Sequence, residues 1–304
     1  MYPALMINHH LCPEHLNSKF MFKYKEIRDN RLIAKKNKDL VTADALKIVV
    51  NSAYGKMNFE HHWLYDPLQA YKVTVNGQLY LMMLSEKLLI NDIAVISKNT
   101  DGILCKIHKS KLETYYKICK EWEQETNFEL EFTNYNLYAR RDVNTYIAIT
   151  DKGKIKQKGD FVIDTPLQKG VDKKIIAIAL QNYFIHNKSI KDTIMNHINI
   201  YDFCTAQKTD VKFTTEYHYL KDSQLQVDTM QKTNRFFISR SGGILFKVDK
   251  KENKYINFCV GRQVTIFNNY VEKPMSEYNI DYGYYISETQ KIIDLIIPPQ
   301  LTLF

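Results

Sequence analysis

The stretch Lys47-Ile-Val-Val-Asn-Ser-Ala-Tyr-Gly-Lys56 organises the rest of this sequence. At about 100° per residue, its apolar side chains and the one just before it form a helical stripe of Leu46, Val49, Val50 and Ala53. A second stripe carries a cation, an amide and an aromatic ring, at Lys47, Asn51 and Tyr54. We expect Gly55 to end the helix, because glycine adopts a positive φ without steric cost. Spacing alone equally fits an ordinary amphipathic surface helix with a glycine cap.

The same residues contain the string K-x-x-x-N-S-x-Y-G, which resembles motif B of the family B DNA polymerases. The resemblance implies a fingers helix that lies over the incoming deoxynucleoside triphosphate (dNTP). Lys47 would then reach the triphosphate, because an ammonium group is a compact charge suited to phosphate. Tyr54 would pack beside the nascent base pair, since an aromatic ring stacks on any base. The resemblance also assigns Asn51 to the dNTP and Gly55 to the DNA.

The composition indicates a folded chain with a polyanionic partner. Its 304 residues are 45% hydrophobic, enough for a sizeable core and for two or three domains. The formal net charge of +8 favours nucleic acid as the partner. The five cysteines are scattered, so we expect reduced thiols in a cytoplasmic compartment, that of a host cell if the source is viral or phage. No apolar run has membrane-spanning length and the first residues show no signal-peptide pattern, so we expect no membrane partner.

A basic segment precedes the motif B helix. Residues 20–40 have helical periodicity, with three cations on one stripe at Arg28, Arg31 and Lys35. Such a run is commonly a solvated helix face. Because we expect a connection near residues 38–42, the two helices can pair as a hairpin. The resemblance then implies that Arg31 and Lys35 join Lys47 around the triphosphate, where three cations suit phosphoryl transfer.

The first residues, Met1-Tyr-Pro-Ala-Leu-Met-Ile, predict a short strand or loop. They resemble the second half of motif A of the same family, D-x-x-S-L-Y-P-x-x-M, with Tyr2, Pro3 and Met6 in register. The resemblance places Tyr2 under the sugar of the dNTP, where it would exclude a 2′-hydroxyl. It places the catalytic aspartate of motif A ahead of Met1. Histidines and a cysteine follow within residues 9–15, but their spacing matches no standard zinc pattern.

A long helix and a hairpin come next. Residues 66–92 predict a turn and a helix that is apolar on most sides and hence buried; its core candidates are Met82, Met83, Leu84, Leu88 and Leu89. Residues 93–96 and 103–107 predict two strands that meet at Asn99-Thr-Asp-Gly102. These four residue types are also those of a plain hairpin turn.

The hairpin turn resembles motif C of the family, usually D-T-D, with Asn99 replacing the first aspartate. The resemblance implies that Asp101 is catalytic and binds Mg²⁺, with Lys47 as the other catalytic residue, and that Thr100 lies beside the DNA. Two Mg²⁺ ions normally need at least two carboxylates. Asp101 is the one motif carboxylate that this chain supplies.

Residues 109–128 predict a helix in which we identify no candidate catalytic or binding residue.

Residues 138–149 and 154–159 predict two strands and a glycine stop. They resemble the family's K-x-Y element and the lysine-rich strand after it, with Tyr146 and Gly159 matching and Asn144 in place of the lysine. The resemblance implies contacts to primer–template DNA by Tyr146 and Gly159, with the cations for the DNA backbone at Arg140, Arg141, Lys156 and Lys158. Phosphate contacts of this kind position a duplex without reading its sequence.

Residues 166–304 resemble a polymerase thumb by position only. We expect helices over 172–186 and 190–201 and a closing helix after residues 278–286, with a tyrosine- and lysine-rich segment between them. Arg235 and Arg240 either contact a duplex backbone or lie in a solvated loop.

The expected fold class is therefore α+β, a right-hand polymerase with an antiparallel palm sheet, helical-hairpin fingers and a mixed α/β thumb. We assign residues 1–20 and 59–165 to the palm, 21–58 to the fingers and 166–304 to the thumb. The expected function is DNA-directed DNA synthesis from dNTPs with two Mg²⁺ ions, as half of a split enzyme or as a truncated frame. An upstream polypeptide would carry the exonuclease domain and the motif A aspartate. The alternatives are a non-catalytic DNA-binding remnant and a single-strand RNA-binding module.

Overall fold

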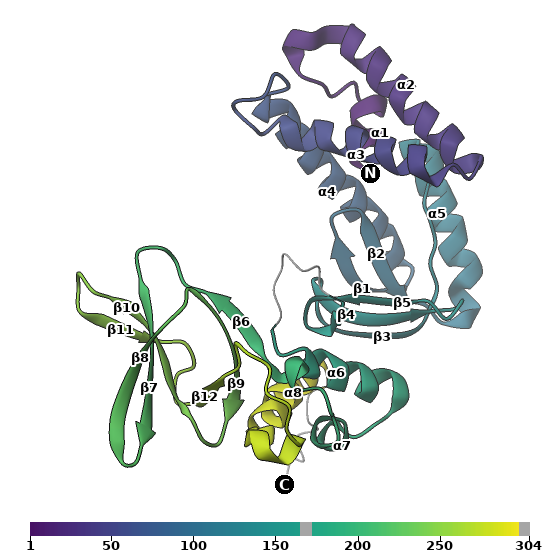
Figure 1. Ribbon diagram of the computed structural model, residues 1–304. Coiled ribbons are helices and arrows are strands. Elements are labelled where there is room, and N and C mark those ends of the chain that lie inside the picture. Colours follow the sequence, from purple (N-terminus) through teal and green to yellow (C-terminus); the bar gives the residue numbers. More distant parts are fainter. Residues whose placement is uncertain (165–171, 298–304) are drawn as a thin grey trace. The chain divides into compact units, whose positions relative to one another are not determined.

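Figure 1 shows the computed structural model, which describes residues 1–164 and 172–297. The chain divides into two compact units, residues 1–132 and 133–304, and each is described by itself. The predicted α+β class is confirmed, because helices occur together with antiparallel sheets. In the described part of the chain, no helix combines the length and apolarity needed to cross a membrane.

The first unit is mainly helical. It contains α1 (Tyr2–Asn8), α2 (Asn17–Lys36), α3 (Leu40–Lys56), α4 (Pro67–Ile90) and α5 (Leu112–Thr126). The expectation of a strand or loop at the start is wrong, because residues from Tyr2 onward form α1, with Pro3 in the first turn, where a missing N–H costs nothing. Asp66 caps α4 by accepting a hydrogen bond from the Gln69 N–H at 3.1 Å.

The predicted helical hairpin of α2 and α3 is confirmed. The two helices pack against each other, and the buried Tyr24 hydroxyl of α2 donates to the Val50 carbonyl of α3 at 2.8 Å. Asp39 caps α3 through the Thr42 N–H at 3.1 Å. The glycine stop is wrong: Gly55 has no positive φ and α3 continues to Lys56. The fully buried Met57 keeps the chain helical beyond the glycine, since its N–H bonds back to the Ala53 carbonyl.

Helix α4 is amphipathic rather than buried on most sides. Leu84 and Leu88 are buried as expected, but Met82 and Leu89 are about half exposed, which corrects two of the predicted core positions. The buried face contacts α1, α5 and the β-hairpin. Gly77 lies where α1 crosses: a Cβ there would lie 2.9 Å from Met1 Cε and 3.2 Å from Leu5 Cδ1. The missing side chain lets the start of α1 lie close to α4.

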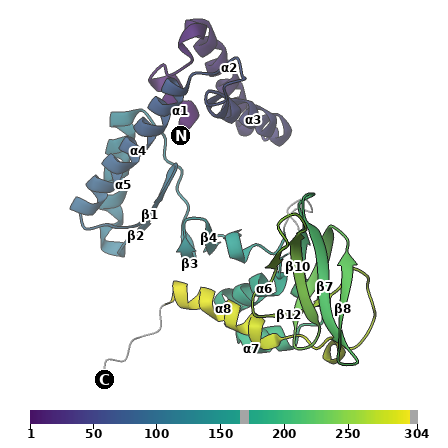
Figure 2. The ribbon, with the colours of Figure 1, turned by 90° about the vertical axis from the view of Figure 1, so that its left-hand side faces the viewer.

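The predicted hairpin is confirmed as β1 (Ala94–Asn99) and β2 (Gly102–Lys106), which form a two-stranded antiparallel sheet. Asn99 pairs with Gly102, so Thr100 and Asp101 are the two residues of the turn. In Figures 1 and 2, the start of α1 lies close to the tip of this hairpin. Helix α5 covers α4 with the buried Cys119 and Trp122.

The second unit begins with a three-stranded antiparallel sheet in the order β3-β4-β5. Its strands are β3 (Tyr135–Asp142), β4 (Thr145–Thr150) and β5 (Ile155–Lys158). The prediction of one continuous strand over residues 138–149 is wrong, because a turn at Val143 and Asn144 divides it. Asp142 accepts a hydrogen bond from the Asn144 N–H at 2.7 Å, the local Asp bond that favours a turn over a strand.

A seven-stranded antiparallel sheet forms most of the remainder and was not predicted. Its strands are β6 (Thr205–Lys208), β7 (Thr214–Lys221), β8 (Gln224–Met230), β9 (Thr233–Ser239), β10 (Gly243–Asp249), β11 (Lys254–Asn257) and β12 (Gln263–Ile266). They run in the order β6-β9-β12-β10-β7-β8, and β11 pairs with β10. The helices are α6 (Lys174–His186), α7 (Ile190–Met195) and α8 (Tyr282–Ile296), so the second predicted helix is shorter than expected.

Tyr285 anchors α8 to this sheet. Its ring is fully buried, and its hydroxyl accepts from the Ile238 N–H at 2.9 Å and donates to the Phe203 carbonyl at 2.8 Å. Burial raises the pKa of the Tyr285 phenol well above its ordinary value. The closing tyrosines therefore serve the core of the second unit.

Candidate functional site

Two tyrosines from the first unit meet at the start of α1. The ring centroids of Tyr2 and Tyr54 lie 4.3 Å apart, with the ring planes inclined by 38°. Tyr54 comes from the last turns of α3, and its hydroxyl shares a 2.7 Å hydrogen bond with the Thr74 hydroxyl of α4. Three helices therefore fix the position of this aromatic pair.

The Asp101 carboxylate shifts the pKa of two groups at the start of α1, the Tyr2 phenol and the Met1 amino group. Burial raises the pKa of the Tyr2 phenol, and Tyr54 and the Asp101 carboxylate raise it further. Burial lowers the pKa of the Met1 amino group, the Asp101 carboxylate raises it, and the Arg31 guanidinium lowers it. Side chains from α1, α2, α3 and the β1–β2 turn are thus brought together, although they are up to about a hundred residues apart in sequence.

The two arginines of α2 differ in their neutralisation. Arg28 Nε lies 2.6 Å from the Asp29 carboxylate, an ion pair within the helix. The Nε atoms of both arginines are buried without a hydrogen-bond partner in the part of the chain that the structure describes, but Arg31 has no ion pair either. A buried donor without a partner is costly, so Arg31 is the arginine that a bound anion would satisfy.

Lys35, Lys47 and Asn51 are exposed. Among residues 1–164 and 172–297, their side chains have no ion pair or side-chain hydrogen bond. Lys47 and Tyr54 are seven residues apart on α3, so the unpaired ammonium lies on the same stripe as the ring, about 10 Å along the helix axis. The predicted dNTP residues therefore include free cations at one end of the stripe and stacked rings at the other.

The residues around the hairpin turn do not by themselves fit a two-ion magnesium site. Asp101 offers one exposed carboxylate, and the Asn99 amide oxygen next to it accepts a 3.0 Å hydrogen bond from the Thr100 hydroxyl. Within the described ranges, no cluster of three or more His, Cys, Asp or Glu side chains could hold a metal. Two Mg²⁺ ions need at least two carboxylates, so a second acidic group would have to come from outside these residues.

In the second unit, strand register places the predicted DNA-contact residues on one face. Arg140 pairs with Tyr146, which pairs with Lys158, and Tyr138 pairs with Ala148, which pairs with Lys156. Directly paired residues point to the same side of a sheet. The opposite face contributes Ile147, Leu137 and Ala139 to the core beneath. The cations and rings therefore share the face turned away from that core.

This face has an aromatic lining that the sequence did not single out. Tyr138 stacks on Tyr146 with centroids 5.3 Å apart and an interplanar angle of 16°. Lys156 Nζ lies 5.1 Å from the Tyr135 ring centroid and donates to the Tyr135 hydroxyl at 3.1 Å. Lys158 donates to the Asn144 amide oxygen at 2.8 Å. Three tyrosines within twelve residues, at 135, 138 and 146, were the signal that could have identified this surface, but strand alternation alone would place 135 and 138 on opposite faces, and a register shift lies between them.

Arg141 and Gly159 already have contacts within the unit. The Arg141 guanidinium binds Asp142 at 3.0 Å, Thr145 at 3.1 Å and the Asp160 carboxylate, and the hydrogen bond to Asp142 raises its pKa. Gly159 has a φ of +65°, and a Cβ there would lie 2.5 Å from Thr145 Oγ1 and 2.6 Å from the Asn144 carbonyl oxygen. These contacts explain both residue types without a ligand, and their DNA contacts stay predictions.

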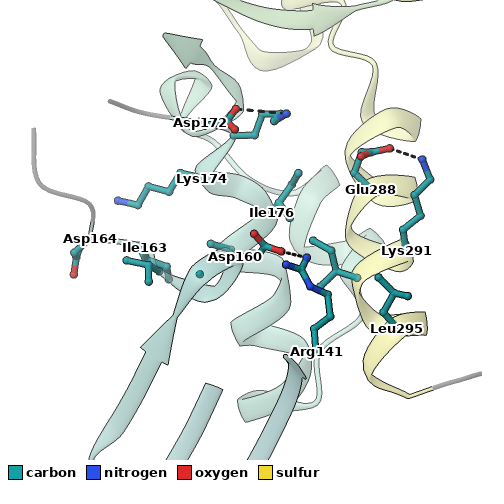
Figure 3. A pocket seen from close by; sticks show the side chains of 15 residues that line it. Arg141, Asp160, Ile163, Asp164, Asp172, Lys174, Ile176, Glu288, Lys291 and Leu295 are labelled. Carbon is teal, nitrogen blue, oxygen red and sulfur yellow. Dashed lines mark hydrogen bonds and ion pairs between the residues drawn. The ribbon is translucent and has the colours of Figure 1, made fainter. Parts of the chain in front are cut away.

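Figure 3 shows a pocket next to Arg141, about 620 Å³ in volume, lined by the 3₁₀ helix Gly159–Phe161 and the residues after it, by α6 and by α8. Most of its charges are paired across the lining: Arg141 with Asp160, Lys173 with Asp172, and Lys291 with Glu288. A pocket with balanced ion pairs holds little net charge to attract a charged ligand. We assign no ligand to it.

A search with protein-family models finds no match to this chain, and a comparison with curated proteins finds no significant similarity. The functional interpretation therefore rests on the residues and their geometry.

We expect Gly159→Ala to destabilise the second unit more than Gly153→Ala does. Both glycines have positive φ, but Gly153 has open space around its Cβ position, so it isolates the backbone strain of about 1–2 kcal/mol. The clash at Gly159 adds an overpacking cost of about 1–3 kcal/mol. Urea unfolding of the two variants measures the difference, and equal unfolding free energies would contradict a steric role for Gly159.

Proposed function

We propose that this chain is the fingers, palm and thumb part of a DNA-directed DNA polymerase of family B. The observation that supports it best is the meeting at Tyr2 of the Tyr54 ring from α3 and the charge of Asp101 from the hairpin turn. The motif B and motif C resemblances involve these two elements, and nothing in their sequence separation requires them to be close. A polymerase needs them on opposite sides of one nucleotide.

In this function, Arg31, Lys35 and Lys47 bind the triphosphate. The three side chains are free of ion pairs within the described residues, so their charge is available to an anion. Tyr54 stacks beside the base pair, and Tyr2, held against it, limits the space at the sugar. Asn51 lies between Lys47 and Tyr54 on the stripe and can hydrogen-bond the nucleotide. These residues orient the nucleotide, which is a large part of catalysis in phosphoryl transfer.

The resemblance implies two Mg²⁺ ions. Asp101 would supply one carboxylate ligand, and the described residues contain no acidic cluster that could complete the site. We propose that a second polypeptide supplies the missing carboxylate, and that it carries the exonuclease domain. The surface of α4 is consistent with such a partner. One face of this helix exposes an apolar stripe of Leu68, Tyr71, Leu79, Met82 and Leu89. Large exposed apolar surfaces mark interaction sites. Among the described residues, the β1–β2 sheet has two strands, and each therefore has one edge that pairs with no other strand.

In this proposal, residues 1–20 and 59–165 form the palm, 21–58 the fingers and 166–304 the thumb. Primer–template DNA lies on the face of the β3–β5 sheet that carries Arg140, Tyr146, Lys156 and Lys158. In the first unit, Gly55 and Thr100 are proposed to contact DNA. Phosphate contacts by lysines would hold the duplex without regard to its sequence.

The second candidate is a DNA-binding protein without catalysis. The β3–β5 face favours this candidate. The cations and stacked tyrosines of that face all come from this chain, and DNA binding by them requires no metal. The two candidates differ in what Asp101 does: it is essential for synthesis in the first and dispensable for DNA binding in the second.

Primer extension distinguishes them. We expect no extension by the purified chain alone and extension when the polypeptide encoded immediately upstream is added. Asp101→Ala should lower the rate of the pair by about 100-fold or more, because it removes a carboxylate that would hold Mg²⁺, and the ion would stabilise the charge on the reacting phosphate. Extension by the chain alone would contradict the need for a partner. DNA binding that persists without extension under any combination would favour the non-catalytic candidate.

Triphosphate binding tests the cation cluster without catalysis. We expect Lys47→Ala to weaken binding of a fluorescent dNTP about tenfold, since a charge-assisted contact contributes about 1.5–3 kcal/mol. Lys36→Ala is the matched control, because Lys36 is an exposed lysine next to Lys35 on α2. Equal affinities of the two variants would argue against a triphosphate at this helix.

The salt dependence of duplex binding tests the sheet face. Replacing Lys156 and Lys158 together by alanine should reduce the slope of log K against log salt by about 2, because each phosphate contact contributes about 0.9. The control is the same replacement at Lys152 and Lys154, in and after the β4–β5 turn. A slope reduced equally in both double variants would show that only net charge matters.

A further inference from the structure

A cavity of about 470 Å³ opens on the second unit beside the short 3₁₀ helix Ile200–Phe203. Its walls are mostly apolar and aromatic, with one cation, and include Ile198, Tyr201, Tyr270, Lys273, Met275 and Tyr278. The cavity takes no part in the dNTP or duplex sites above. Its size is in the range of small-ligand sites, which bind through apolar walls and a few polar groups.

Two tyrosines present ring surface at this cavity. The Tyr201 and Tyr270 rings are nearly parallel, with centroids 5.9 Å apart and an interplanar angle of 16°. Tyr270 is 58% exposed and Tyr201 is 37% exposed, so part of each ring faces solvent. The buried Phe267 supports Tyr201 edge-on at 5.5 Å. Because a buried ring supports this exposed aromatic pair, its side chains lose little conformational freedom when a ligand stacks on them.

Cations flank the aromatic wall. Arg235 Cζ lies 5.1 Å from the Tyr201 ring centroid, and Lys273 Nζ lies 4.6 Å from that of Tyr278. Lys273 donates to the backbone carbonyl of Glu277 at 3.0 Å. In the described part of the chain, neither cation forms an ion pair, although Glu272 is next to Lys273 in the sequence and Glu277 lies in the 3₁₀ helix Met275–Tyr278. Their charge is therefore available to an anion.

We propose that this cavity binds an unpaired base of single-stranded DNA. Tyr270 and Tyr201 stack on the base, and Arg235 and Lys273 contact the flanking phosphates. Rings beside cations are the combination by which proteins hold single strands without sequence preference. A duplex is excluded because its bases are already stacked and paired, and taking one out costs free energy. The site requires neither a dNTP nor Asp101, so it does not depend on the polymerase function.

Photocrosslinking to the full chain locates the base. We expect a thymidine oligonucleotide of about 12 residues that carries 5-iododeoxyuridine to crosslink to the peptide containing Tyr270 or Tyr201. Tyr270→Ala should weaken binding of the oligonucleotide about 5- to 100-fold, as for the loss of one base-stacking ring. Tyr270→Phe should bind nearly as the unaltered chain does, because the ring is kept. Affinity for a duplex of the same length should not change.

Tyr255→Ala is the matched control, since Tyr255 is a similarly exposed tyrosine on β11 and should leave the affinity unchanged. Lys47→Ala should leave the Tyr270 crosslink intact. The single-strand proposal and the dNTP proposal can therefore be contradicted independently of each other. The proposal is overturned by crosslinks that map only elsewhere, or by a Tyr270→Ala affinity equal to that of the unaltered chain.

Discussion

The packing of α1 between α3 and α4 is the contact on which the first unit depends. Gly77 lacks a side chain at the crossing, so Leu5 and Tyr2 approach α4 closely. Tyr2 then meets Tyr54, whose hydroxyl is held by Thr74 of the same α4. Because α4 leads directly into the β1–β2 hairpin, the same crossing fixes where Asp101 lies relative to the aromatic pair. One close helix crossing therefore positions rings and a carboxylate from three separate motifs.

Electrostatics explains why these residues suit a polyanion. Arg28 is neutralised by its neighbour Asp29, whereas Arg31, Lys35 and Lys47 lack acidic partners within the described residues. Their charge is therefore available to a polyanion such as the proposed triphosphate. The opposite imbalance exists at the hairpin turn, where one carboxylate stands beside an uncharged Asn99. The cation half of a nucleotide site is thus more complete than the metal half.

The second unit presents two surfaces with the same chemistry and different shapes. On the β3–β5 sheet, cations and stacked tyrosines lie on an open face, as required for contact with a backbone. Beside the 3₁₀ helix Ile200–Phe203, tyrosines line a cavity. An open face can follow a regular duplex, whereas a cavity accepts only a base that has left the stack. Shape, rather than composition, would separate the two proposed ligands.

The sequence by itself determined the helical hairpin, the turn at Thr100 and Asp101, and the helix that begins at Pro67, because capping residues and turn residues act over a few positions. By motif resemblance it also assigned residues to a dNTP, and those assignments stay predictions. It did not determine the end of α3 at Gly55, where the core position of Met57 overrides the glycine, or the seven-stranded sheet. Only the tertiary structure decided that Tyr2 meets Tyr54 and that Tyr201 and Tyr270 share a cavity. Those properties arise from contacts between segments far apart in the chain, which local periodicity does not encode.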